Sequence, residues 1–336
     1  MKKFIQLLVG CSVSAVMMYV AFKDLDVARL QENIFTIQLW PVLPFIALFG
    51  VHFYLRSLRW RLLLPTPQGE QPGLRTLFDA MMLGNLATFL LPLRLGEFVR
   101  PLMLSRWSEY RFASSFISVV IERFFDLSAV LITFAIVVPL LPQLPDWATV
   151  GAYSLGTLAF GLLLFLILGC LFPTFIRSLV TIFVKPLPAS LGQLVSRFLG
   201  DLLTGAAVIK TPSRLLGIVV LTGLVWLSSF LQFYALLFMF PEQQHSFLLG
   251  VTLCVFVSLA VALPSAPGFV GVFQAACVAA MILFWGADPV STSAAQLYSI
   301  LSHLISFLMV IGIGFWVLAV HDLRFFQLKK AAETDS

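Results

Sequence analysis

The sequence predicts an all-α polytopic membrane protein, and its composition and its long apolar runs both point to this class. Of the 336 residues, 60% are hydrophobic and only 11% are charged, and the mean hydropathy is +0.99. A soluble domain carries about a quarter charged residues, so this chain could not cover its apolar surface in water. A helix of about 20 apolar residues crosses a bilayer, and several runs reach that length.

Eight apolar elements follow one another along the chain. Six predict full spans, near residues 4–22, 41–60, 112–140, 149–172, 215–239 and 293–320. Two more, 76–91 and 247–285, are interrupted by proline and glycine and predict broken, re-entrant hairpins. Residues 1–320 thus form one transmembrane domain, followed by a polar cytoplasmic tail, 321–336. Residues 1–22 start like a signal peptide but lack a small-x-small cleavage site, so we interpret them as a retained span.

The basic residues predict the orientation. With the N-terminus inside, 18 of the 21 Lys and Arg fall in inner loops and at inner helix ends. The outer loops hold only Lys23 and Arg29, and Arg123 is left inside the membrane. Cytoplasmic loops are enriched in Lys and Arg. We therefore expect both termini to face the cytoplasm, in a bacterial inner membrane.

The order of the elements predicts an inverted repeat. The first half, about 1–140, reads span, span, broken segment, span, and the second half, about 149–320, repeats this order from the other side. Such a plan is typical of secondary transporters. The alternative is a fortuitous order, because a four-element pattern is easily found among eight elements. Within the second half, 187–210 has one apolar face at helical spacing and predicts a cytoplasmic interfacial helix.

The first broken segment brings charge to a backbone break. Pro92 removes a backbone donor and Gly96 permits a sharp turn. Arg94, Glu97 and Arg100 follow at intervals of three, so a helical stretch would align them. Backbone groups freed at membrane depth must face protein or a wet cavity. We therefore predict a substrate-binding or translocation site here; the alternative is a cytoplasmic loop with solvated charges.

The second broken segment occupies the same place in the second half. Its breaking residues, with one serine between them, are Pro264, Ser265, Pro267, Gly268 and Gly271. It follows a loop without Lys or Arg, so we expect it to enter from outside. Paired breaks in corresponding positions point to a site near the membrane midplane, where the two are expected to approach each other. The alternative is a tight hairpin between two ordinary spans.

The predicted span 112–140 contains three ionisable residues, Glu122, Arg123 and Asp126. Charges at this depth are costly unless they are paired or hydrated. The two acids outnumber their one local base, so we expect Arg94 and Arg100 to balance them in a cluster that also holds Glu97 and opens to the cytoplasm. The alternative is a structural salt bridge.

A basic stripe marks the second span, where His52, Arg56 and Arg59 recur at helical spacing. Guanidinium groups match phosphate oxygens well. The alternative is a set of anchors whose charged ends reach the membrane interface. For Arg59 alone the sequence favours that alternative, and Trp60 also has the character of an interface anchor.

Four patches occur in one order along the chain: Arg56-Ser57-Leu58-Arg59-Trp60; Asn85 through Leu91-Pro92-Leu93-Arg94-Leu95-Gly96-Glu97 with Arg100; Glu122-Arg123-Phe124-Phe125-Asp126; and Pro264-Ser265-Ala266-Pro267-Gly268-Phe269-Val270-Gly271. In these patches the chain resembles the flippase-like family that includes the transmembrane region of lysylphosphatidylglycerol synthases. The resemblance implies a helical domain associated with moving lipids between leaflets. It does not imply lipid aminoacylation, because we expect no soluble aminoacyl-transfer domain here.

Together these features predict a flippase or transporter for a phosphate-bearing lipid, phospho- or polyprenyl-linked, with an anionic headgroup. We expect no catalytic residues, cofactor, metal or nucleic acid, since the sequence has no Walker loop, dinucleotide fingerprint, HExxH motif or nucleophile elbow. A partner could be a lipid-modifying synthase or a glycosyltransferase. The alternatives are a membrane-embedded enzyme that uses Glu97, Glu122 and Asp126 on a lipid-linked substrate, and a scaffold for a partner synthase.

Overall fold

The computed structural model describes residues 2–65, 71–91, 95–141 and 211–323, with scattered positions between 150 and 168 and with side chains from Val9 onward. Regular structure in these residues is entirely helical. Among the described residues, five helices are long and apolar enough to cross a membrane, and two more are shorter and apolar. The predicted class, a helical polytopic membrane protein, is therefore confirmed. The predicted interfacial helix 187–210 lies outside the described residues.

The helices are α1 (Lys2–Phe22), α2 (Val27–Thr36), α3 (Val42–Leu63), α4 (Leu74–Leu90), α5 (Gly96–Trp107), α6 (Phe112–Val137) with the short η2 (Val138–Leu140), α10 (Pro212–Leu237), α11 (Phe247–Ala262), η4 (Pro267–Phe269), α12 (Val272–Trp285) and α13 (Pro289–Val320). The predicted spans 41–60, 112–140, 215–239 and 293–320 correspond to α3, α6 with η2, α10 and α13. Hydropathy alone therefore located the long helices closely.

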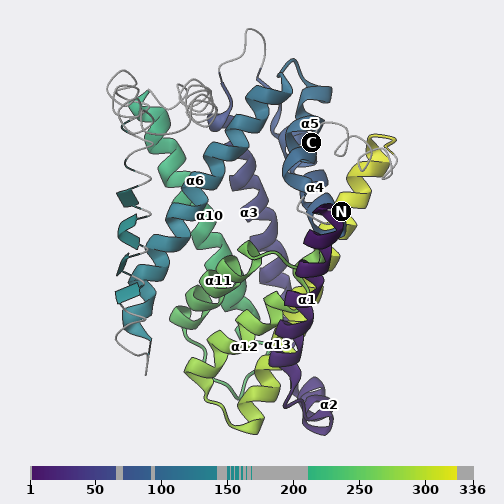
Figure 1. Cartoon of the computed structure of the whole chain (residues 1–336), viewed down its shortest axis with the longest axis vertical. Helices are drawn as coiled ribbons and strands as arrows, with labels where there is room; N and C mark the ends of the chain where they lie inside the picture. The colour runs from purple at the N-terminus through teal and green to yellow at the C-terminus, as the bar shows by residue number, and fades with distance from the viewer. Residues whose placement is uncertain are drawn as a thin grey trace.

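Two hairpins enter the bundle from opposite ends (Figure 1). Helices α4 and α5 occupy the upper half of the view and α11 and α12 the lower half, while α3, α6 and α10 run along much of its height. The tips meet inside the bundle, where the ring of Phe89 at the end of α4 lies 5.6 Å from that of Phe269 in η4. This contact agrees with the expected approach of the two broken segments, and their position at the membrane midplane stays a prediction. Pro92, Leu93 and Arg94 lie outside the described residues.

The helix contacts pair the two halves in the way that an inverted repeat would. Helix α3 packs on α10, its counterpart in the second half. Helix α4 packs on α13, and α11 packs on α6. Helices α4 and α11 hold the same place in the two halves, as do α6 and α13, so the two contacts are equivalent. In both breaks a proline precedes a glycine by four residues, Pro92 with Gly96 and Pro267 with Gly271. These paired features favour the repeat over a fortuitous order of elements.

Helix α1 supports the second break. The backbone N–H of Ala266 donates to the hydroxyl of Ser14 at 2.8 Å. A side chain on Gly271, whose φ is +90°, would collide with the carbonyl oxygen of Ser14. A backbone donor left unpaired in a membrane is costly, so this contact stabilises the break. Residues of the N-terminal span are thus part of the packed fold.

The basic residues separate along the bundle. Arg61, Arg106 and Arg214 lie at the ends of α3, α5 and α10 that point to the top of Figure 1, and Lys23 and Arg29 lie beside or within α2 at the bottom. This division agrees with the charge asymmetry read from the sequence. The assignment of the upper end to the cytoplasm stays a prediction.

The α4–α5 hairpin depends on close contact at Gly96. A Cβ atom there would overlap the carbonyl oxygen of Gly84 and the hydroxyl of Thr88. We expect Gly96→Ala to force the two helices apart and destabilise the protein by about 1–3 kcal/mol. The measurement is the midpoint of thermal unfolding in detergent. Gly50→Ala is the matched control, since nothing lies within 4 Å of a Cβ there; equal midpoints for the two variants would contradict the prediction.

Candidate functional site

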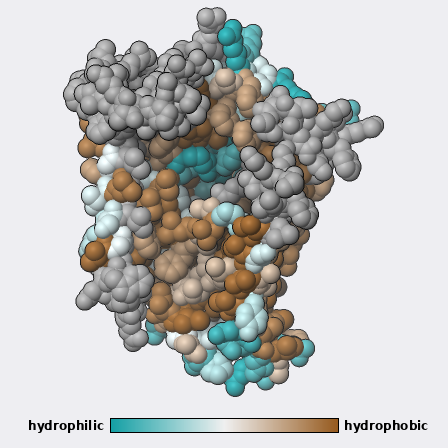
Figure 2. Space-filling view, viewed as in Figure 1, coloured by the Kyte–Doolittle hydropathy of each residue, from teal (hydrophilic) through white to brown (hydrophobic). Residues whose placement is uncertain are grey.

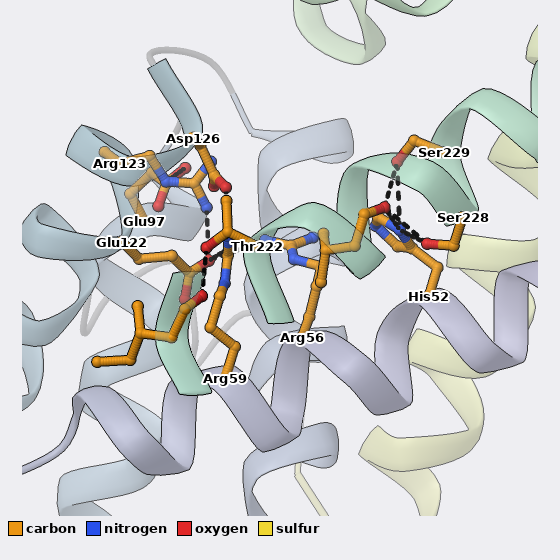
Figure 3. A network of polar contacts seen from close by, with 12 residues as sticks. His52, Arg56, Arg59, Glu97, Glu122, Arg123, Asp126, Thr222, Ser228 and Ser229 are labelled. Atoms are coloured by element: carbon orange, nitrogen blue, oxygen red, sulfur yellow. Dashed lines mark hydrogen bonds and ion pairs between the residues drawn. The ribbon is translucent and has the colours of Figure 1, made fainter. Parts of the chain in front are cut away.

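Seven charged side chains from three helices form one network inside the bundle (Figure 3). We call it the charge cluster. Its members are Arg56 and Arg59 from α3, Glu97 and Arg100 from α5, and Glu122, Arg123 and Asp126 from α6. The structure thus brings together residues up to 70 positions apart in the sequence, and the α3 stripe supplies two of the four bases.

Glu122 is the centre of the charge cluster. Its side chain is completely buried, and Arg100 binds both carboxylate oxygens, at 2.9 and 2.8 Å. The guanidinium groups of Arg56, Arg59 and Arg123 approach Oε1 at 3.3, 3.3 and 3.2 Å. A buried carboxylate is costly unless it is paired and hydrogen-bonded, and here both oxygens are engaged.

The anchor interpretation of Arg59 and Trp60 is wrong. Arg59 is completely buried and donates to Asp126 at 2.6 Å and to the hydroxyl of Thr222 at 3.3 Å. Trp60 is also completely buried, and the guanidinium of Arg100 lies 3.8 Å from its ring centroid. This face of α3 points at α6 and α10 instead of at the membrane interface. The acids of α6 therefore attract Arg59 inward.

The cluster has an excess of positive charge. Its four arginines face three carboxylates, which differs from the expected balance of three acids and three bases. Arg94, expected among the bases, lies outside the described residues. Arg123 is 44% exposed and pairs with Glu97 at 3.6 Å, so the cluster opens to the surface on this side.

A polar cleft lies over the charge cluster. It spans about 220 Å³, a volume that includes space open to solvent, and is lined by Arg56, Met81, Gly84, Asn85, Thr88, Gly96, Glu97, Arg100 and Arg123. Figure 2 shows a hydrophilic hollow in the upper half of this face, above a largely hydrophobic surface. Glycines 84 and 96 let α4 and α5 pack closely beside it.

An aromatic groove adjoins the polar cleft between α3, α4, α10 and α13. It encloses about 660 Å³, part of it open. Its apolar walls are Phe45, Phe49, Phe53, Phe89, Phe233, Leu236 and Val310, and its polar walls are His52, Asn85, Ser229, Gln232, Ser302 and Ser306. Asn85 lines both spaces, and His52 lies one helical turn from Arg56. The two spaces are therefore neighbours along α3 and α4.

The groove extends far from the charge cluster. Phe45 lies in the first turn of α3 and Leu236 in the last turn of α10. Eleven residues separate Phe45 from Arg56, which is about 16 Å along a helix. Cleft and groove together thus run from the charged level of the bundle to near its opposite end.

His52 joins α3 to α10 inside the groove (Figure 3). Its Nδ1 atom lies 3.0 Å from the hydroxyl of Ser228 and 3.3 Å from that of Ser229. These contacts fix the orientation of the ring at the end of the groove nearest to Arg56. The imidazole thereby presents a polar group among phenylalanines.

The two broken segments contribute differently to these spaces. The first broken segment lines the polar cleft with Asn85, Gly96, Glu97 and Arg100. Helices α3 and α6 add Arg56 and Arg123 to the cleft, and they place Arg59, Glu122 and Asp126 in the charge cluster below. The second broken segment lines neither space with its breaking residues, which are Pro264, Ser265, Pro267, Gly268 and Gly271. They form the turn that packs on α1 and on the tip of α4. Pro92 and Arg94 fall outside the described residues.

Sequence reasoning missed most of the polar wall of the groove. Ser229 and Gln232 recur at i, i+3 on α10, and Ser302 and Ser306 at i, i+4 on α13, so each pair shares a helix face. That spacing was an available signal. It is weak by itself, because isolated serines in apolar helices commonly bond to their own backbone.

Comparison with known proteins identified one family. The family described as the lysylphosphatidylglycerol synthase transmembrane region matches residues 7–314, a range that includes both hairpins, the polar cleft and the aromatic groove. No curated protein and no solved structure matches the chain.

Proposed function

Because the chain belongs to the family of lysylphosphatidylglycerol synthase transmembrane regions, we propose that it moves a phosphate-bearing lipid, phospho- or polyprenyl-linked, between membrane leaflets. The observation that carries the proposal is the junction at Asn85 of a cationic polar cleft with an aromatic groove. A lipid has the same two parts, a charged headgroup and apolar chains. In this proposal the cleft faces the cytoplasm, the side favoured by basic helix ends.

The headgroup phosphate binds in the polar cleft. Arg56 is only 13% exposed and its one ion pair in the described structure is the 3.3 Å contact with Glu122. Arg123 is the more exposed of the two. Guanidinium groups bind phosphate oxygens in fork geometry, so either arginine can exchange part of its carboxylate contact for a phosphate. The remaining arginines keep Glu122 compensated during that exchange.

The groove provides the route onward. A charged group alone at the centre of a bilayer costs roughly 2.5–3.5 kcal/mol even on lenient scales. His52, Asn85 and Gln232 supply polar contacts along the groove, while the phenylalanines contact the chains. The route therefore lowers the cost of moving a headgroup past the hydrocarbon layer.

The pairing of the acids favours transport over the enzyme alternative. Glu97, Glu122 and Asp126 each contact a guanidinium group. Glu122 and Asp126 accept hydrogen bonds from guanidinium groups and are therefore poor general bases, whereas Glu97 forms an ion pair with Arg123 at 3.6 Å. Lipid composition then sets the direction of movement, and a lipid-modifying synthase or glycosyltransferase is the partner that this proposal calls for.

The test is lipid movement in proteoliposomes. Purified protein is reconstituted with tail-labelled phosphatidylglycerol, and a membrane-impermeant quencher reports the label that reaches the outer leaflet. We expect Ser306→Phe, which fills the groove, to slow movement at least about tenfold, an added barrier of about 1.4 kcal/mol. Leu308→Phe on the same helix is the control, because Leu308 is 57% exposed and lines no part of the groove. Equal rates for protein-free and protein-containing liposomes would refute the proposal.

A further inference from the structure

Helix α2 is too short to cross a membrane. Its ten residues, Val27–Thr36, give a length of about 15 Å, half of the roughly 30 Å hydrocarbon thickness of a bilayer. It connects α1 to α3 and lies at the lower end of the bundle in Figure 1. Helix α3 starts shortly after α2 and carries Arg56 and Arg59 toward its other end. Helix α2 is therefore at the end of the bundle that lies opposite the charge cluster.

One side of α2 packs on protein, and the side next to it is apolar and exposed. Leu30 and Ile37 are partly buried against the core, and the helix packs on α13. None of the residues of α2 is fully buried. Val27 and Ile34 recur at i, i+7 and are exposed, and Phe35 beside them is 89% exposed. This apolar side has no partner among the described residues.

The polar residues of α2 occupy the remaining side. Glu32 and Thr36 are exposed and share a helix face at i, i+4, and Thr36 lies two and a half turns from Val27, on the opposite side. Asp26 caps the helix by accepting from two backbone N–H groups of the first turn at 3.1 and 3.2 Å, and it pairs with Arg29 at 3.0 Å. Charged groups that are this exposed need water, so α2 cannot lie within the hydrocarbon layer.

The apolar side of α2 continues onto a surface that is expected to contact lipid. Leu39 and Trp40, in the connection to α3, are exposed, and Leu43 in the first turn of α3 is 72% exposed. Helix α3 is long and apolar enough to cross a membrane, so an exposed leucine on it faces acyl chains. The indole N–H of Trp40 donates to the side chain of Gln38 at 2.8 Å. Tryptophan is enriched where the hydrocarbon layer meets the headgroups.

We propose that α2 binds the lipid leaflet at this end of the bundle as an interfacial helix. The side chains of Ile34 and Phe35 enter the acyl chains below the headgroups, and Glu32 and Thr36 face water. A short helix with one apolar and one polar side, joined to a span, has the form of such a helix. In the predicted orientation the leaflet is the outer one. The inference goes beyond the proposed transport function and does not depend on it.

Fluorescence quenching from the two sides of the interface tests this placement. The full chain, with its four native cysteines replaced by alanine, receives one nitrobenzoxadiazole-labelled cysteine through Ile34→Cys, Phe35→Cys, Glu32→Cys or Thr36→Cys. All four positions are exposed, so the label should not disturb packing. In phosphatidylcholine vesicles with nitroxide-labelled acyl chains, we expect labels at 34 and 35 to be quenched at least about twofold more strongly than labels at 32 and 36. Iodide on both sides of the vesicle should quench them in the reverse order.

Each outcome decides the placement. Equal quenching of all four labels by iodide would show that α2 stands away from the lipid, which would overturn the inference. Labels at 34 and 35 that neither quencher reaches would show that protein covers the apolar side, a second copy of this chain for example, and would overturn it too. Unfolding midpoints that match the cysteine-free protein establish that the variants are folded. Quenching in the expected order without lipid movement in the proteoliposome assay would support the interfacial helix and overturn only the transport proposal.

Discussion

Arg56→Ala is expected to reduce the movement of anionic lipids by about 10- to 100-fold while the protein stays folded. The reduction follows from the loss of a charge-assisted hydrogen bond to the phosphate, worth about 1.5–3 kcal/mol. The fold survives because Glu122 keeps Arg59, Arg100 and Arg123 as partners. Removal of Arg56 also brings the charge cluster to three bases and three acids. The measurement is the initial rate of phosphatidylglycerol movement in proteoliposomes.

Two further variants qualify this result. Arg56→Lys keeps the charge without the guanidinium fork and should give an intermediate rate. Arg61→Ala, five residues further along α3, removes an arginine that binds Gln71 and lines neither space. Its rate should match that of the unaltered protein. A folded Arg56→Ala protein with an unaltered rate would show that the phosphate binds elsewhere.

Glu122→Gln is expected to have the largest effect on stability. The substitution leaves four arginines against two acids and removes the partner that Arg100 binds through two hydrogen bonds. Breaking a buried ion pair on one side costs about 3–5 kcal/mol. The midpoint of thermal unfolding in detergent should therefore fall sharply. Glu109→Gln is the control, because Glu109 is exposed between α5 and α6.

The double variant Glu122→Gln with Arg100→Gln identifies the cause. If the uncompensated guanidinium destabilises Glu122→Gln, removing that guanidinium should raise the midpoint again. A double variant less stable than Glu122→Gln would instead show that packing at these positions dominates. An unaltered midpoint for Glu122→Gln alone would contradict the inference that this carboxylate stabilises the charge cluster.

The sequence predicted the helices well because their signals are local. The long apolar runs correspond to α3, α6, α10 and α13, and the prolines and glycines at the two breaks mark where the hairpins turn. The charge cluster was predicted in part for the same reason, since unpaired charge in a span demands partners. Arg100 was named among those partners, and it binds Glu122.

What the sequence could not show depends on which helices become neighbours. The direction in which the basic stripe of α3 faces depends on the position of α6, which the sequence does not show. Arg59 was therefore predicted at the membrane interface, whereas in the structure it is buried against Asp126. The aromatic groove is bounded by α3, α4, α10 and α13, which are far apart along the chain. No local pattern reports the space that four such helices leave unfilled.

The two hairpin tips can meet only after nearly the whole chain has been synthesised. The tip at Phe89 rests on η4, and α4 packs on α13, which emerge from the ribosome long after α4 and α5. Until then the tip of the first hairpin at Phe89 lacks its final surroundings, and lipid cannot satisfy any backbone group left unpaired there. The contacts that surround the first hairpin in the folded protein can therefore form only when the second half of the chain is in place.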